Sequence, residues 1–154
     1  YIREASPDFI LRTTVMLGFP GETEEQFKLL YGFLKNEPFD RVGAFAFCPE
    51  DGTKAALMDG QIDEATAKAR LDKIMRMQQT VSLELNKKRI GKEYEVLIER
   101  VDKDACYGRS YAEAPDVDGI IKIKNVPVCV KPGDFIYAKI TDASAYDLKG
   151  EFVK

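Results

Sequence analysis

Two apolar segments on either side of an amphipathic pattern constrain most strongly how this chain begins to fold. Residues 9–19 (FILRTTVMLGF) and residues 41–47 (RVGAFAF) have the apolar and β-branched character of buried strands. The helix expected between them carries one apolar face, formed by Phe27, Leu30, Tyr31 and Leu34. Strand, helix and strand in this order predict a βαβ unit, whose two strands are parallel and joined by a right-handed crossover.

The turn after the first strand, Gly18-Phe-Pro-Gly-Glu22, has unusual chemistry for a simple connection. Gly18 and Gly21 lack a Cβ and would let a ligand approach the backbone, and Pro20 would stiffen the turn. Thr23 followed three residues later by Gln26 predicts a capping box at the start of the helix. The turn either forms part of a ligand site at a strand end or is only a well-capped connection.

A single βαβ unit cannot cover both faces of its sheet, although parallel sheets normally have both faces covered. Residues 1–62 are therefore expected to be the last part of a larger α/β sheet or barrel. The chain begins with Tyr1 rather than Met, which agrees with a piece of a longer protein. The uncovered sheet could also pair with a second copy, so a homodimer of the piece is a further possibility.

The pattern changes twice along the rest of the chain. Residues 63–90 predict a long connecting helix, with one stripe that is more typical of packing against the protein than of partner binding. From Gly91 to Lys154 short strands alternate with turns, which predicts a small closed antiparallel β-barrel. The five expected strands are residues 94–101, 106–111, 119–124, 134–141 and 146–153. The fold class is α/β plus all-β, with domains 1–62, 63–90 and 91–154.

Composition excludes several kinds of site. The chain has no histidine, and Cys48, Cys106 and Cys129 have no C-x-x-C spacing, so no metal or redox site can be predicted. The odd number of cysteines favours a reducing cytoplasm over a disulfide framework, and no apolar run is long enough to cross a membrane. Residues 91–154 contain 10 basic and 12 acidic residues. A dedicated nucleic-acid binder usually has a basic excess, so nucleic acid is the less favoured partner.

Several motifs together resemble one enzyme family. RTTVMLGFPGETEEQF is similar to a late strand of radical S-adenosylmethionine methylthiotransferases, and FDRVGAFAFCPEDGTKAA to the strand and loop that follow it. The segments MQQTVS and LNKKRIGKEYEVLIE resemble the bridge into a TRAM domain, which is a small β-barrel. GRSYAEAPDVDG, residues 108–119, and VKPGDFIYAKITDASAYDLKGE resemble the branch that modifies a ribosomal protein rather than the tRNA-modifying branches.

The resemblance implies a concrete activity for the parent protein. That branch adds a methylthio group to the β-carbon of an aspartate in ribosomal protein S-twelve, using S-adenosylmethionine and two [4Fe–4S] clusters held by cysteines. Neither set of cluster cysteines is present here, so the piece alone is expected to be inactive and to hold no cluster. Cys48 stands where the family more often has serine, so it is expected to be an ordinary thiol.

The resemblance also suggests two groups of site residues. The first group would lie near S-adenosylmethionine and contains Arg12, Thr14, Gly18, Pro20, Gly21 and Glu22. The second group would help dock the basic protein substrate through complementary charge and contains Arg109, Tyr111, Glu113, Asp116 and Asp118. No catalytic residue is assigned. The alternative for the second group is a solvated loop whose carboxylates have no specific partner.

Two other functions remain open from the sequence. In a tRNA methylthiotransferase the TRAM domain would bind RNA, but a basic surface would then be expected; Lys122 and Lys124 alternate as on any solvent-facing strand. The chain could instead be part of a stand-alone binding module. A C-x-x-x-C-x-x-C motif upstream of Tyr1 would identify a radical enzyme, and its absence would favour the module.

Overall fold

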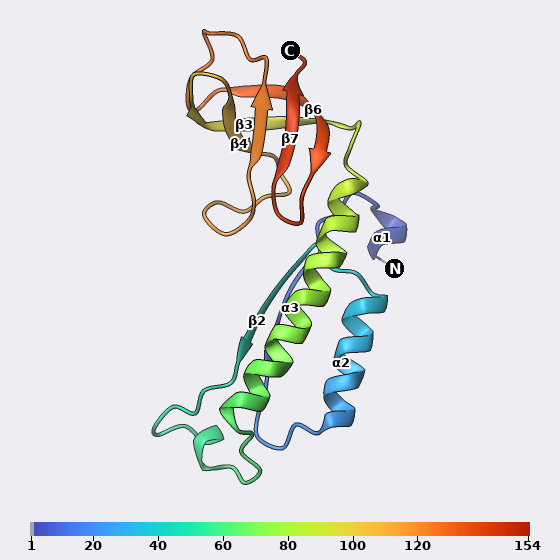
Figure 1. Cartoon of the computed structure of the whole chain (residues 1–154), viewed down its shortest axis with the longest axis vertical. Coiled ribbons are helices and arrows are strands. Elements are labelled where there is room, and N and C mark those ends of the chain that lie inside the picture. Colours follow the sequence, from blue (N-terminus) through green and yellow to red (C-terminus); the bar gives the residue numbers. More distant parts are fainter. Residues whose placement is uncertain (1) are drawn as a thin grey trace. The chain divides into compact units, whose positions relative to one another are not determined.

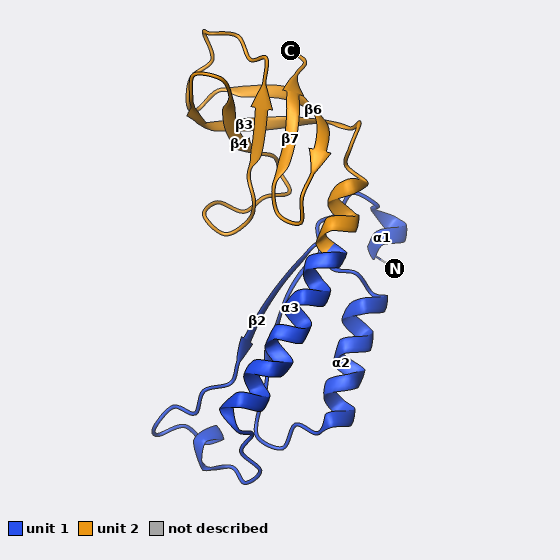
Figure 2. Cartoon of the chain, viewed as in Figure 1, with its two compact units in different colours: residues 1–81 blue, residues 82–154 orange. Residues whose placement is uncertain are grey.

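The computed structural model describes residues 2–154, which form two compact units. Unit 1 comprises residues 1–81 and unit 2 residues 82–154 (Figure 2). The division falls inside α3, the long helix Glu64–Lys87, which follows the predicted connecting helix closely. The predicted domain limits at residues 62 and 90 remain predictions, because the division between the compact units lies at residue 81 and does not test them.

Unit 1 contains the predicted βαβ unit. Helix α1 (Ile2–Ala5) precedes β1 (Arg12–Leu17), α2 (Glu24–Asn36), β2 (Arg41–Ala46) and the short 3-10 helix η1 (Ala55–Leu57). Strands β1 and β2 are parallel and in register from Arg12 opposite Arg41 to Leu17 opposite Ala46 (Figure 1). The predicted capping box is present: Thr23 Oγ1 accepts the backbone N–H of Gln26 at 3.2 Å, and Gln26 Oε1 accepts that of Thr23 at 2.9 Å.

One face of the β1–β2 sheet is covered by the two helices. The buried core of this unit consists of Leu17, Phe27, Leu34, Ile74 and Met77. The stripe on α3 therefore packs against its own unit, as predicted, and its polar member Gln78 donates to the backbone oxygen of Phe39 at 3.0 Å. Within unit 1, the residues of the other sheet face remain exposed: Arg12, Thr14, Met16, Gly43 and Phe45.

Unit 2 contains a closed barrel of five strands, in the order β3-β4-β5-β7-β6. The strands are β3 (Glu93–Val101), β4 (Cys106–Arg109), β5 (Ile121–Lys124), β6 (Phe135–Ala143) and β7 (Leu148–Phe152). All five expected strands are present. Four pairings are antiparallel, whereas β5 and β7 are parallel, so the barrel is mixed. The parallel pair arises because β6 lies next to β3, which leaves β7 to close the barrel beside β5.

Apolar side chains fill the barrel interior, and the close pairing of β3 and β4 requires a glycine at one position. Alternate strand residues point inward, and the core consists of Val96, Ile98, Cys106, Ile121, Ile123, Ile136, Ala138, Ile140 and Leu148. A Cβ at Gly108 would lie 2.1 Å from the backbone oxygen of Leu97, which no side chain tolerates. Within residues 2–154 the structure contains no helix with the length and apolar character that crossing a bilayer requires.

Candidate functional site

The turn that follows β1 is held in place by α3. Glu22 Oε1 accepts from Arg70 Nη1 at 2.6 Å, while Glu22 Oε2 accepts the backbone N–H of Gly18 at 2.9 Å. Both charged side chains are nearly buried, and the Arg70 guanidinium also lies over the ring of Phe27, 5.4 Å from its centroid. A buried ion pair with additional hydrogen bonds fixes the groups that it joins. The turn therefore has one well-defined shape.

The two glycines of this turn are used differently. Both have positive φ angles, +74° for Gly18 and +84° for Gly21. A Cβ at Gly18 would lie 2.5 Å from the Cβ of Ala67 on α3, whereas a Cβ at Gly21 would meet nothing within 4 Å. The backbone N–H of Gly21 donates to the oxygen of Gly60 at 2.8 Å. Gly18 therefore permits close helix packing, and only Gly21 borders open space.

The six residues expected near a cofactor do not form one surface. Arg12 and Thr14 lie on the exposed face of the β1–β2 sheet, and Gly21 borders open space at the end of β1. The remaining three contribute to the turn itself, because Pro20 is buried, Gly18 packs on α3 and Glu22 pairs with Arg70. Three of the six are thus available to a ligand.

The three cysteines differ in their exposure to solvent. Cys48 and Cys129 are exposed, and Cys106 lies in the barrel core, where burial, with a smaller effect from Asp102, raises the pKa of its thiol. Among residues 2–154 no group of three His, Cys, Asp or Glu side chains is arranged to hold a metal ion.

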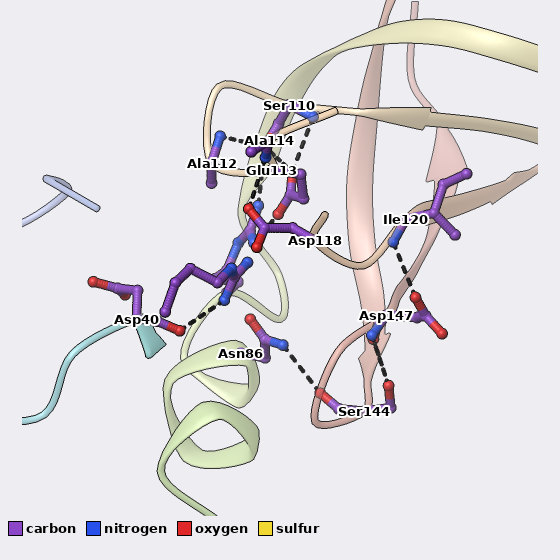
Figure 3. Close-up of polar contacts among 12 residues, drawn as sticks. Asp40, Asn86, Ser110, Ala112, Glu113, Ala114, Asp118, Ile120, Ser144 and Asp147 are labelled. Carbon is purple, nitrogen blue, oxygen red and sulfur yellow. Dashed lines mark hydrogen bonds and ion pairs between the residues drawn. The ribbon is translucent and has the colours of Figure 1, made fainter. Parts of the chain in front are cut away.

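The second candidate region is the loop from Ser110 to Gly119, and its carboxylates have separate roles (Figure 3). Glu113 is buried: Oε1 accepts from Arg89 Nη1 at 2.5 Å, and Oε2 accepts from Ser110 Oγ at 2.6 Å and from the Ser110 backbone N–H at 2.9 Å. Asp118 Oδ2 accepts the backbone N–H of Ala114 at 2.7 Å. Asp116 is exposed at the tip of the loop with φ +61°.

These positions revise the expected docking surface. Glu113 was expected to offer its charge to a partner, but its carboxylate faces Arg89 inside the protein. Arg109 forms a surface ion pair with Glu99, with 2.7 Å between Nε and Oε1. Tyr111 is largely exposed. Of the five residues expected to dock a substrate, Tyr111 and Asp116 are the most accessible.

The environment of Glu113 determines its protonation. Burial raises the pKa of a carboxyl group, but here the hydrogen bond and charge of Arg89 and the hydrogen bonds from Ser110 outweigh burial, so the pKa of Glu113 is lowered from its ordinary value of 4.5. Burial would likewise lower the pKa of Arg89, but Glu113 and Tyr94 outweigh it and raise that pKa. At neutral pH the two groups therefore form an ion pair.

The lowered pKa of Glu113 predicts a stability that depends on pH. A carboxyl group whose pKa is lower in the folded state than in the unfolded state stabilises the fold. Its full contribution is present at pH values above the unfolded pKa, near 4.5, and is lost as the pH falls through the folded pKa. The free energy of unfolding should therefore decrease below about pH 4.5 more steeply in the natural chain than in Glu113→Gln. Urea unfolding at several pH values measures this difference. Equal pH dependence of the two proteins would contradict the prediction.

Sequence patterns alone did not single out Arg70 and Arg89, the two arginines that organise these regions. Arg70 precedes Ile74 by four residues, so it lies on the buried stripe of α3, where an arginine is unusual without a partner. Arg89 lies just beyond the end of α3 and is almost buried. A charged residue on an otherwise apolar helical face was the available signal for Arg70. No local sequence pattern indicated the role of Arg89, because its partner Glu113 lies 24 residues away.

A row of cationic and aromatic side chains crosses the outside of the barrel. Arg100 of β3, Tyr107 of β4, Lys122 of β5 and Lys149 of β7 are direct neighbours across successive strands. The Arg100 guanidinium lies 3.9 Å and the Lys122 ammonium 5.6 Å from the centre of the Tyr107 ring. The ends of the row are paired, Arg100 with Asp102 and Lys149 with Asp142. The sequence showed only that Lys122 and Lys124 alternate on β5. The structure adds that Lys122 has charged and aromatic neighbours on the adjacent strands.

Comparison with known proteins finds similarity to one domain family and to one named group of proteins. The TRAM domain family matches residues 90–153. Proteins named "Ribosomal protein uS12 methylthiotransferase RimO" are similar over nearly the whole chain. The protein from Carboxydothermus hydrogenoformans is 46% identical over 154 residues, covering 99% of this chain and 35% of its own length. The protein from Dictyoglomus thermophilum is 48% identical over 153 residues, covering 99% and 35%.

A third relative, from Pasteurella multocida, has the same name and is 44% identical over 152 residues, covering 98% of this chain and 34% of its own length. The chain thus spans about a third of the length of these relatives. The resemblance to methylthiotransferases is therefore confirmed over nearly the whole chain. The chain corresponds to about a third of the length of the RimO proteins, and its residues 90–153 match the TRAM domain family.

Proposed function

We propose that this chain is part of an enzyme that methylthiolates the β-carbon of an aspartate in ribosomal protein S-twelve. The observation that carries the proposal is the similarity, at 42–48% identity, to proteins named for this activity. The TRAM domain would help to dock the protein substrate. The reaction would take place in the cytoplasm and use radical S-adenosylmethionine chemistry, in which the bound cofactor and its iron–sulfur cluster supply the radical that removes a hydrogen atom.

The turn after β1 supports a role of unit 1 beside the cofactor. Arg12 and Thr14 on the open sheet face, together with the backbone around Gly21, offer polar groups and space for a ligand. Gly18, Pro20 and Glu22 would act indirectly, by giving the turn its shape. In the longer protein, Gly21→Val should weaken S-adenosylmethionine binding. Unchanged affinity would separate this turn from the cofactor.

The substrate is tested with the longer protein that contains this chain. After anaerobic reconstitution with iron and sulfide, and with S-adenosylmethionine and a reductant supplied, it should replace one hydrogen of purified S-twelve by a methylthio group, and peptide fragmentation should place that group on an aspartate. The 154-residue chain under the same conditions should produce no modification and no iron–sulfur absorption band. Modification of tRNA and not of S-twelve would overturn the proposal.

The cross-strand row supports a second candidate, RNA binding by the barrel of a tRNA methylthiotransferase. Cations neutralise phosphates, and an aromatic ring stacks on bases, so Arg100, Tyr107, Lys122 and Lys149 have the chemistry of a nucleic-acid surface. Tyr107→Ala and Lys122→Ala should then weaken binding to bulk tRNA, with Lys131→Ala as the control. Binding too weak to measure at physiological salt would remove this candidate.

The open sheet face of unit 1 needs a cover in either case. We propose that the rest of the longer protein covers it, and that in the isolated piece a second copy could do so. Light scattering of the 154-residue chain measures this directly. A doubled mass would support the homodimer of the piece, and a monomer would exclude it.

A further inference from the structure

We propose that residues 110–118, here called the recognition loop, bind a basic segment of the protein substrate through Tyr111, Asp116 and Val117. The identity of that partner rests on the proposed function. In this proposal Arg89 and Glu113 make no contact with the substrate but position the loop. The surface differs from the one expected from sequence, since it excludes Arg109, Glu113 and Asp118 and includes Val117.

The base of the recognition loop is closed by a buried polar network. Glu113 binds the backbone and hydroxyl of Ser110 on one side and Arg89 on the other. Arg89 Nη2 also donates to Ser110 Oγ at 3.1 Å, which completes a cycle of three side chains. Burying such an ion pair carries a desolvation cost that apolar residues would avoid. Its effect is to hold the start of the loop in a single conformation.

The tip of the loop is closed separately. Asp118 accepts the backbone N–H of Ala114 through its carboxylate, and its own N–H donates to the oxygen of Ala114 at 3.3 Å. These two bonds span the residues between them and hold Asp116 at φ +61°, a left-handed conformation that is uncommon for residues other than glycine. The carboxylate of Asp116 is thereby presented outward by a defined backbone.

Contacts through the Tyr94 ring connect the base of the loop to its exposed surface. The Arg89 guanidinium lies 4.6 Å from the centre of the Tyr94 ring, and the ring centres of Tyr94 and Tyr111 are 6.2 Å apart. Tyr111 is nevertheless 65% exposed, and Val117 is 74% exposed. A large side chain that is both exposed and supported from behind loses little conformational entropy when it binds. Tyrosine in this position is a frequent anchor of protein interfaces.

The chemistry of the exposed groups indicates the partner. Tyr111 and Val117 offer apolar surface, and Asp116, next to Val117 in the same loop, adds a negative charge. A segment with an apolar side chain next to lysine or arginine matches this arrangement, whereas the phosphates of RNA would be repelled by it. S-twelve, the basic ribosomal protein of the proposed function, fits that description. The cationic row lies on strand residues of the barrel and does not include the loop.

The test measures binding of the 154-residue chain to purified S-twelve, with exposed substitutions that leave the buried network intact. Tyr111→Ala should raise the Kd about tenfold, and Val117→Ala should raise it severalfold. The matched controls are Tyr146→Ala and Val128→Ala, at positions 54% and 104% exposed elsewhere in unit 2, and these should leave the Kd unchanged. Asp116→Asn should slow association mainly at low salt, with Asp104→Asn as its control.

The outcomes separate the two proposals. If the natural chain binds S-twelve but the loop variants bind as tightly as their controls, the recognition loop is overturned and the proposed function is unaffected. If the natural chain does not bind S-twelve, the loop proposal fails, while the modification assay with the longer protein still decides the function.

Discussion

Replacement of Arg89 by methionine is expected to lower the free energy of unfolding of unit 2 by about 3–5 kcal/mol, the usual cost of removing one partner of a buried ion pair. The side chains of Arg89 and Glu113 are only 11% and 2% exposed, so the remaining carboxylate would stay buried without a cation. Urea unfolding at neutral pH, followed by circular dichroism, measures the loss. Methionine keeps most of the apolar volume, so the effect reports mainly on charge.

Arg109→Met is the matched control for this prediction. Arg109 also pairs with a glutamate of unit 2, Glu99, but both partners lie at the surface. Its replacement should cost less than about 1 kcal/mol, because exposed ion pairs contribute little. The double variant Arg89→Met with Glu113→Leu should recover part of the loss, since no unpaired charge is then buried. Equal losses for Arg89→Met and Arg109→Met would contradict the structural role of the buried pair.

Gly18→Ala is expected to destabilise unit 1 by about 2–5 kcal/mol, the sum of two effects at one position. A left-handed backbone disfavours any Cβ by roughly 1–2 kcal/mol, and overpacking against Ala67 adds about 1–3 kcal/mol. The new methyl group would lie 2.5 Å from the Cβ of Ala67, which is far inside van der Waals contact. The midpoint of urea unfolding measures this change.

Gly21→Ala separates the two effects. Gly21 has nearly the same φ angle as Gly18, but a Cβ there meets no atom within 4 Å, so only the backbone cost of about 1–2 kcal/mol should appear. The double variant Gly18→Ala with Ala67→Gly removes the 2.5 Å contact, leaving the Cα of residue 67 at 3.3 Å, and should be more stable than Gly18→Ala alone. If the two single alanine variants lost the same stability, helix packing at Gly18 would not explain its presence.

Local patterns account for the elements that the sequence predicted. The capping box of Thr23 and Gln26, the apolar face of α2 and the five barrel strands all depend on residues a few positions apart, and each is present. The uncovered sheet face also follows from simple counting, because one crossover helix cannot cover two faces. The resemblance to methylthiotransferases could be recognised as well, because its motifs are short runs of neighbouring residues.

The candidate sites were predicted less completely, because their roles depend on contacts between distant residues. The sequence placed the carboxylates of residues 113, 116 and 118 in one loop, but could not distinguish the buried member from the exposed one. Burial of Glu113 depends on Arg89, 24 residues earlier, and the shape of the Gly18 turn depends on Arg70, 48 residues after Glu22. Neither pairing follows any local periodicity.

The sequence by itself therefore determined the βαβ unit, the long helix, the barrel and the resemblance to methylthiotransferases, since these follow from periodicity, turn residues and motifs. Only the tertiary structure decided the parallel β5–β7 pairing, the outward row across the barrel and which charged residues are internal partners. The physical reason is that strand order and the burial of a charge depend on how the chain closes on itself, which brings together residues that are far apart in sequence.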